Sequence, residues 1–247
     1  MKVIFLGTNG WFDSKTGNTI CTLIQTKSAN IILDAGMGLA KADKYLDDSL
    51  PAYIFLSHLH LDHICGLHAL AKFKFSQGLT LFVPKQLKSA LLEYIDQPFT
   101  MPIKRLPFKL KIVNSKPDFK IGNINIKARE LIHASVCLGY RLSFSNKIIS
   151  YCTDTGLCEN AFYLADKADL LITECALAYG QDDQGWPHLD PQKAAMLAKQ
   201  AKAKKLVMTH FDADNYQTLK ARKIAQKQAR KVFSESIVAF DELVIEI

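Results

Sequence analysis

Short apolar runs alternate with turn residues along most of this chain, and longer stretches with helical spacing follow near its end. Apolar runs bounded by Gly, Asn, Ser or Asp predict β-strands. They lie at residues 3–6, 20–25, 31–33, 53–56, 81–83, 108–113, 124–132, 140–144 and 148–152. Later strands at 170–173 and 205–209 alternate with helices at about 191–202 and 216–233, and two further helices are expected at about 64–73 and 84–94. Pro191 fits the first helical position, with Asp190 as the cap.

Strand-rich halves flanked by helices predict two sheets packed face to face with helices on the outer faces, which is an α+β fold. The chain shows no repeat, linker or low-complexity segment. We therefore expect residues 1–247 to form one domain.

Composition indicates a globular protein without a membrane segment. Hydrophobic residues make up 49% of the chain and charged residues 22%, and no apolar run approaches the ~18 residues that a membrane span needs. The N-terminal MKVIFLGTNGW lacks a cleavage pattern and reads as a first strand, so we expect a cytoplasmic protein. The six cysteines form no Cys-x-x-Cys pair, and we expect them to be reduced.

The net charge of +7 would raise the encounter rate of an anionic substrate. Much of the excess lies in 199–205 and 220–231, where apolar residues recur at helical spacing beneath the lysines. No aromatic residues interleave the basic ones for base stacking, which favours a solvated helix face over a nucleic-acid patch.

The segment 57–67, SHLHLDHICGL, carries the strongest chemical signal. His58 and His60 are two apart on an extended segment, so both can face one ion. Asp62 is expected to cap the following helix, and His63 to turn toward a second ion. Imidazoles and carboxylates are ligands that zinc prefers, so the segment predicts a metal site.

This segment resembles the His-x-His-x-Asp-His signature of the metallo-β-lactamase superfamily, whose αββα sandwich carries a dinuclear metal site at one edge of two mixed sheets. Other positions match the family in order: Asp34 in NIILDAG resembles its supporting strand-end Asp, His133 in ELIHAS its third ligand motif, Asp154 in ISYCTDTG its bridging Asp, and His210 in KLVMTHF its last His. The resemblance covers essentially the whole chain.

The resemblance implies two zinc ions, one held by His58, His60 and His133 and the other by Asp62, His63 and His210, with Asp154 bridging. Mixed His and carboxylate ligands also accept manganese or iron. Such a pair, ~3.5–4 Å apart, lowers the pKa of a shared water and stabilises the leaving oxygen. Asp62 would additionally orient the resulting metal-bound hydroxide.

Two further positions resemble the ribonuclease Z and phosphodiesterase branch. Glu174 in DLLITECA and His188 in PHLDPQKAAM are similar to a Glu and a His outside the metal shell, of which the His protonates the leaving oxygen. Such acid assistance is typically worth ~10²–10⁴ in rate.

Other positions depart from the branch. The interval between His133 and Asp154 leaves room for a hairpin but not for the arm with which ribonuclease Z grips tRNA. The group's His-Ser-Thr is here His188-Leu189-Asp190, and FDADNY follows where the group has a Ser and Arg pattern. Both differences argue against tRNA 3′ processing.

Together these features predict a phosphodiesterase acting on a small, cyclic or single-stranded phosphodiester, including short nucleic acids. The same centre could instead hydrolyse a lactone or thioester, and a metal- or nucleic-acid-binding module without turnover is the third hypothesis. The Glu174 and His188 pair favours phosphoester cleavage over lactone opening. Relatives are commonly dimers, which leaves a homodimer open.

Overall fold

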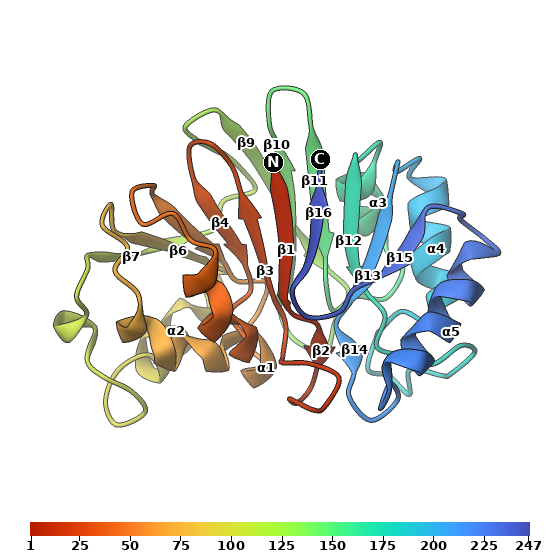
Figure 1. Cartoon of the computed structure of the whole chain (residues 1–247), viewed down its shortest axis with the longest axis horizontal. Helices are drawn as coiled ribbons and strands as arrows, with labels where there is room; N and C mark the ends of the chain where they lie inside the picture. The colour runs from red at the N-terminus through yellow and green to blue at the C-terminus, as the bar shows by residue number, and fades with distance from the viewer.

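The computed structural model describes all 247 residues, folded into two seven-stranded sheets and one two-stranded ribbon. The first sheet has the order β16-β1-β3-β4-β5-β6-β7 and the second β15-β13-β12-β11-β10-β9-β8, while β14 pairs with β2. Both sheets are mixed, with parallel strands β4 to β7 in the first and β11, β12, β13 and β15 in the second. Figure 1 shows the N- and C-termini side by side, where β1 pairs with β16.

The strands of the first sheet are β1 (Lys2–Gly7), β3 (Cys21–Gln25), β4 (Asn30–Leu33), β5 (Ala52–Phe55), β6 (Leu79–Val83), β7 (Leu110–Asn114) and β16 (Leu243–Glu246). Those of the second are β8 (Asp118–Ile121), β9 (Ile124–Leu131), β10 (Cys137–Ser143), β11 (Ile148–Cys152), β12 (Leu170–Glu174), β13 (Leu206–Thr209) and β15 (Ser236–Val238). The ribbon consists of β2 (Asn9–Gly10) and β14 (Phe211–Asp212).

The α-helices are α1 (Leu61–Ile64), α2 (Lys88–Tyr94), α3 (Glu159–Ala165), α4 (Pro191–Gln200) and α5 (Leu219–Arg230). Four 3₁₀ segments join them, namely η1 (Met37–Lys44), η2 (Cys65–Lys72), η3 (Lys85–Leu87) and η4 (Ile103–Arg105). None of the helices is long and apolar enough to cross a membrane.

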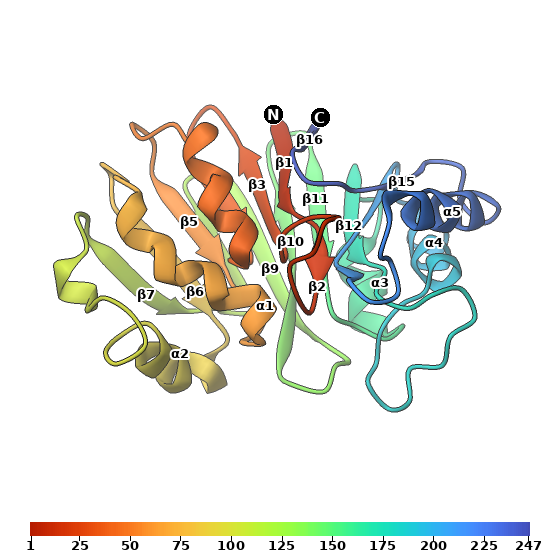
Figure 2. The same ribbon diagram turned by 60° about the horizontal axis from the view of Figure 1, so that its bottom comes forward.

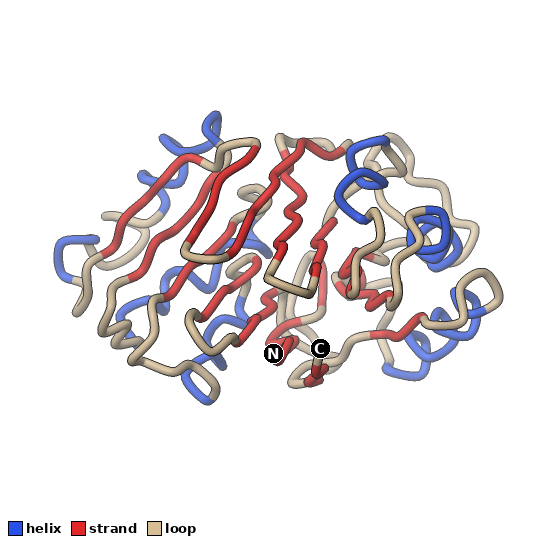
Figure 3. Tube along the Cα trace, turned by 90° about the horizontal axis from the view of Figure 1, so that it is seen from above, coloured by secondary structure: helices blue, strands red, loops and turns tan.

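Alternation along the strands produces the layers. In β1, Val3 and Phe5 belong to the core between the sheets, while Ile4 and Leu6 belong to a second core under η1, η2 and α2. In β12, Leu171 faces a third core under α3, α4 and α5. Figure 3 shows the two sets of strands with helices outside them, so the predicted αββα sandwich is confirmed.

Several helix predictions were wrong in their bounds. The helix expected at 84–94 is the 3₁₀ segment η3 followed by α2, so its α-helical part begins only at Lys88. The helix expected at 64–73 is the short α1 followed by η2, because the Gly66 amide bonds to Ala35 O and leaves the helical ladder. A Cβ on Gly66 would lie 2.1 Å from Gly36 O, so only glycine permits this approach. The helix expected from about 216 begins at Leu219, because the Thr218 hydroxyl accepts a hydrogen bond from Ala221 N and caps it.

The cap predicted for α4 is confirmed. The Asp190 carboxylate accepts a hydrogen bond from Lys193 N at 2.7 Å, and Pro191 occupies the first helical turn. The helix ends two residues before the predicted end, and Lys202 beyond it takes a left-handed conformation with φ 54°. Strands β8, β15 and β16, the ribbon, η1 and α3 were not predicted.

Candidate metal centre and active site

The candidate residues lie where strands of both sheets end. Asp34 follows β4, the segment 58–63 follows β5, and the others follow or end strands of the second sheet: His133 (β9), Asp154 (β11), Glu174 (β12) and His210 (β13). Figure 2 brings this edge forward and shows α1 and β2 near the junction of the two halves. The parallel strands leave their carboxyl ends at this one edge, which is why residues far apart in the sequence meet there.

Three of these strand-end residues have left-handed backbones. The φ angles are 55° at Asp34, 49° at Asp154 and 49° at His210. Residues other than glycine rarely adopt this region, and each such position costs ~1–3 kcal/mol. The surrounding fold therefore fixes the direction of each of these three side chains, and the cost is backbone strain.

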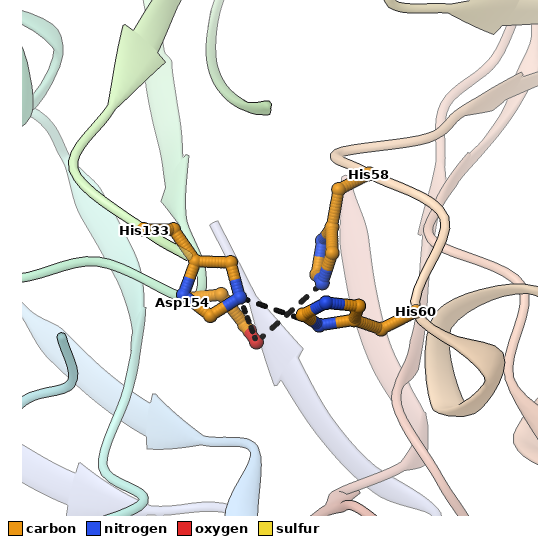
Figure 4. Close-up of side chains that lie close together, drawn as sticks. All are labelled: His58, His60, His133 and Asp154. Atoms are coloured by element: carbon orange, nitrogen blue, oxygen red, sulfur yellow. Dashed lines mark hydrogen bonds and ion pairs between the residues drawn. The ribbon is translucent and has the colours of Figure 1, made fainter. Parts of the chain in front are cut away.

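A first donor set consists of His58, His60, His133 and Asp154, whose ligand atoms all lie within 4.8 Å of one another. Figure 4 shows His58 and His60 facing His133 and Asp154, which come from the other half of the chain. Asp154 Oδ2 lies 3.7 Å from both His58 Nε2 and His133 Nε2. His58 Nε2 is buried without a hydrogen-bond partner, so this set fits a cation better than a hydrogen-bond network.

A second donor set consists of Asp62, His63 and His210. His210 Nε2 lies 3.0 Å from His63 Nε2 and 3.1 Å from Asp62 Oδ2. Asp154 Oδ1 is 3.3 Å from both imidazole nitrogens, so the two oxygens of Asp154 face different sets. Imidazoles and carboxylates at this spacing fit transition-metal ligation.

Asp62 does not cap the helix, contrary to the sequence prediction. The cap position of α1 is His60, which makes no capping bond with its side chain, and Asp62 lies within the helix. Its carboxylate turns into the site, where Oδ2 accepts a hydrogen bond from Trp11 N at 2.8 Å. Contacts with the N-terminal loop and His210 thus replace the expected bond to the helix backbone.

Asp34 supports this arrangement from behind. Its buried carboxylate accepts hydrogen bonds from Ser57 N (2.7 Å), Ser57 Oγ (2.8 Å), His63 Nδ1 (2.8 Å) and Tyr151 OH (2.7 Å). Because Nδ1 of His63 donates to Asp34, Nε2 is left to face the donor set. Asp34 therefore fixes the direction of His63 without entering either set.

Charges in the site shift its pKa values in opposite directions. Burial works against protonated imidazole, but the surrounding carboxylates outweigh it and raise the pKa of His63 well above its usual range. The pKa of His210 is also raised, against burial, by Asp154 and Asp62. Burial and the charge of His63 lower the pKa of His58 well below its usual range. Burial opposes ionisation of Asp154, yet the neighbouring histidines hold the pKa of this carboxyl well below its usual range.

Residues 29–211 match a family model described as a Beta-lactamase superfamily domain. The chain belongs to the metallo-β-lactamase superfamily. It is 25% identical to a ribonuclease Z of Bacillus licheniformis over 98% of this chain and 97% of the relative. Among solved structures it resembles the metallo-β-lactamase fold protein YhfI from Bacillus subtilis (TM-score 0.83, 24% identity, 100% and 99% of the two chains) and the short form of human tRNase Z (TM-score 0.79, 24% identity, 100% and 99%). It is therefore a ribonuclease Z-like hydrolase of this superfamily, as the sequence predicted.

The chain is shorter than the ribonuclease Z of Bacillus licheniformis. The alignment with the ribonuclease Z extends over 304 positions, whereas the chain has 247 residues, so the relative carries segments without a counterpart here. In the structure the interval after His133 is a plain hairpin of β10 and β11, joined by the short turn 144–147. No projecting arm is present between His133 and Asp154.

Glu174 and His188 lie beside the donor sets and contact each other. His188 Nδ1 donates to Glu174 Oε1 at 2.6 Å, and Glu174 is fully buried, where it also accepts from the amides of Thr155, Ala176 and Leu189. Burial disfavours the charged imidazole, but the Glu174 carboxylate outweighs burial and raises the pKa of His188 to about 9. His188 also forms a group with Asp154 and His210 whose ligand atoms lie within 4.8 Å.

A cavity of about 710 Å³ opens over the donor sets. Its walls include residues from the β12–α4 loop that the sequence analysis did not single out, namely Gln181, Asp182, Asp183, Gln184 and Trp186, together with Trp11, Asp212 and Asn215. Loop side chains without a recognisable motif give no sequence signal for such a role. The six cysteines are free thiols and belong to neither donor set.

Proposed function

We propose that this hydrolase is a dizinc phosphodiesterase acting on a small, cyclic or single-stranded phosphodiester. One observation carries the proposal: Asp154 lies between two donor sets and turns one carboxylate oxygen to each, and the bonded pair of Glu174 and His188 lies directly beside them. Relatives named ribonuclease Z support the phosphoester class.

The proposed ligands follow the two donor sets. One zinc ion would be held by His58, His60 and His133, the other by Asp62, His63 and His210, with Asp154 between them. Such a pair of ions, when bound, lowers the pKa of a water molecule and offsets charge that develops on the phosphoryl oxygens. Manganese or iron would suit the same donors.

The chain's own residues supply orientation and a proton. Asp62 is fixed by the Trp11 amide and would accept a hydrogen bond from the attacking water, which holds that water in line. Glu174 fixes the ring of His188 through Nδ1, and Nε2 would deliver a proton to the leaving oxygen. Because Glu174 is buried and fully bonded, the ring has little freedom to turn away.

The test compares two leaving groups in the His188→Ala variant. A nitrophenolate leaves as a stable anion, whereas a ribose oxygen leaves poorly without a proton. We expect kcat for an activated nitrophenyl diester to change little and kcat for a nucleotide diester to fall by roughly 10² or more. Asp62→Ala is the control, since it should slow both reactions. Equal losses on both substrates for His188→Ala would show that His188 is not the acid.

Hydrolysis of a lactone or thioester is the second candidate, and one observation favours it. No Lys or Arg lines the cavity, although a phosphodiester site commonly offers cationic groups. The amide side chains of Gln181, Gln184 and Asn215 lie in the cavity wall and can act as neutral donors. A panel of phosphodiesters, phosphomonoesters, lactones and thioesters at equal metal loading separates the two candidates. A precursor tRNA should be a poor substrate in either case, because the hairpin after His133 offers no gripping arm.

A further inference from the structure

Both tryptophans of the chain are exposed and line the same cavity. Trp11 is 67% exposed and Trp186 51% exposed, and Leu61 beside them is 65% exposed. A single exposed apolar side chain needs no explanation, but apolar side chains gathered at one opening indicate a binding surface. Neither indole belongs to any of the three hydrophobic cores, so packing of the fold does not explain them.

Trp186 is held next to the first donor set. Its ring stacks on His60 with centroids 5.5 Å apart and an interplanar angle of 23°, and it lies perpendicular to the His133 ring with centroids 5.8 Å apart. A turn with left-handed residues at Gln184 (φ 50°) and Gly185 (φ 81°) positions it, and Trp186 N bonds to Asp183 O. The indole is therefore oriented beside the metal-binding side chains, with about half its surface open.

The charges of the cavity wall limit what binds there. The chain has 31 Lys and Arg residues, yet none lines the cavity, whereas Asp182, Asp183 and Asp212 do. A polyanion would place its flanking phosphates against these carboxylates. A substrate with one phosphodiester and an uncharged, flat remainder avoids this repulsion. Carboxylates and amides can also accept and donate hydrogen bonds to sugar hydroxyls and base edges.

We infer that Trp186 is the specificity-determining residue of this site and stacks against the base of a small nucleoside phosphodiester. The inference rests on the proposed function and narrows its substrate class. A ribose links a base to its phosphate, so a base on Trp186 leaves that phosphate within reach of the donor sets next to it. Stacking tolerates any base, because every base has a flat face.

A binding measurement tests the contact without turnover. The Trp11→Phe variant leaves Trp186 as the only tryptophan, so its fluorescence reports this position alone. Titration of the metal-loaded variant with thymidine 5′-monophosphate should quench the fluorescence in a saturable way, and methyl phosphate should not. No quenching, or equal quenching by both, would overturn the inference.

A kinetic measurement uses two esters with one leaving group, thymidine 5′-(4-nitrophenyl phosphate) and methyl 4-nitrophenyl phosphate. Trp186→Ala should lower kcat/KM for the thymidine ester by roughly 5- to 150-fold, mainly through KM, and leave the methyl ester within about twofold. Trp186→Phe should restore most of the loss. Tyr179→Ala is the matched control, since Tyr179 is 56% exposed on the same loop but does not line the cavity.

These outcomes distinguish failure of the proposed phosphodiesterase function from failure of the inference about Trp186. If the wild-type protein cleaves neither ester, the proposed function fails, and the fluorescence titration still decides whether Trp186 binds a base. If Trp186→Ala slows both esters equally, the indole acts through His60 and not through a base, and the inference is wrong.

Discussion

Replacing Asp34 with asparagine turns one buried carboxylate into an amide of nearly the same shape. The backbone there has φ 55°, a conformation that asparagine adopts about as readily as aspartate. The substitution therefore tests the charge and the lone pairs of this side chain while leaving the loop conformation unchanged.

The four donors around Asp34 determine the expected loss. The Asn oxygen can keep the place of Oδ2, which receives Ser57 Oγ, His63 Nδ1 and Tyr151 OH, but the amide nitrogen then faces Ser57 N. Each retained bond loses its charge assistance, and one buried N–H loses its acceptor, which costs ~1–3 kcal/mol by itself. Together we expect the free energy of unfolding of the metal-free protein to fall by about 3 to 5 kcal/mol.

The metal affinity should fall as well, because His63 loses the acceptor that fixes its ring. Partners of this kind are typically worth ~10–100-fold in metal affinity. Urea unfolding in the presence of chelator measures the first effect, and competition with a zinc-binding dye measures the second. Tyr151→Phe is the control, because it removes one donor and should cost only about 1 kcal/mol. Wild-type metal affinity in Asp34→Asn would refute the supporting role of this residue.

Two other predictions concern the donor sets and the loop beside them. Metal analysis of protein purified without chelator should find close to two transition-metal ions per chain. The double variant His58→Ala, His133→Ala should lose one of the two preferentially. A wild-type chain without tightly bound metal would falsify the prediction of a metal centre. The buried Arg222 donates to Thr8 and to Asn9, which precedes the glycine packed on His210. Arg222→Met should therefore lower the unfolding free energy by about 2 to 4 kcal/mol, measured in urea, and loosen the metal ion near His210 more than the other, measured by dye competition.

The sequence was most informative where one physical rule dominates. Strand alternation places Val3 and Phe5 on one face of β1 and Ile4 and Leu6 on the other, and burial on both faces makes such runs conspicuous. The histidines of 58–63 are similarly conspicuous, because so many metal-binding side chains seldom occur together without a metal. Asp190 before Pro191 follows from the geometry of a helix start.

Other features depend on contacts that a linear pattern does not contain. The position of Asp62 before a helical stretch suits a helix cap, but its carboxylate accepts a hydrogen bond from the backbone amide of Trp11, which lies in a loop far away in the sequence. Strand β8 is short and half exposed, and β16 pairs with β1 from the far end of the chain. Glu174 could equally have ended its strand in solvent, and only the fold shows it buried against His188.

The site also connects the two sheets. Asp34 at the end of β4 bonds to Tyr151 of β11, and each donor set takes side chains from both halves of the chain. A ligand bound by both halves stabilises the folded state as it binds, in proportion to the logarithm of its concentration over its dissociation constant. Without metal, the surrounding carboxylates outweigh burial and raise the pKa of His63, which favours a proton on the imidazole nitrogen that would otherwise bind a metal ion. Metal and proton then compete for this nitrogen, and metal binding, with the stability it adds across the sheets, should weaken as the pH falls.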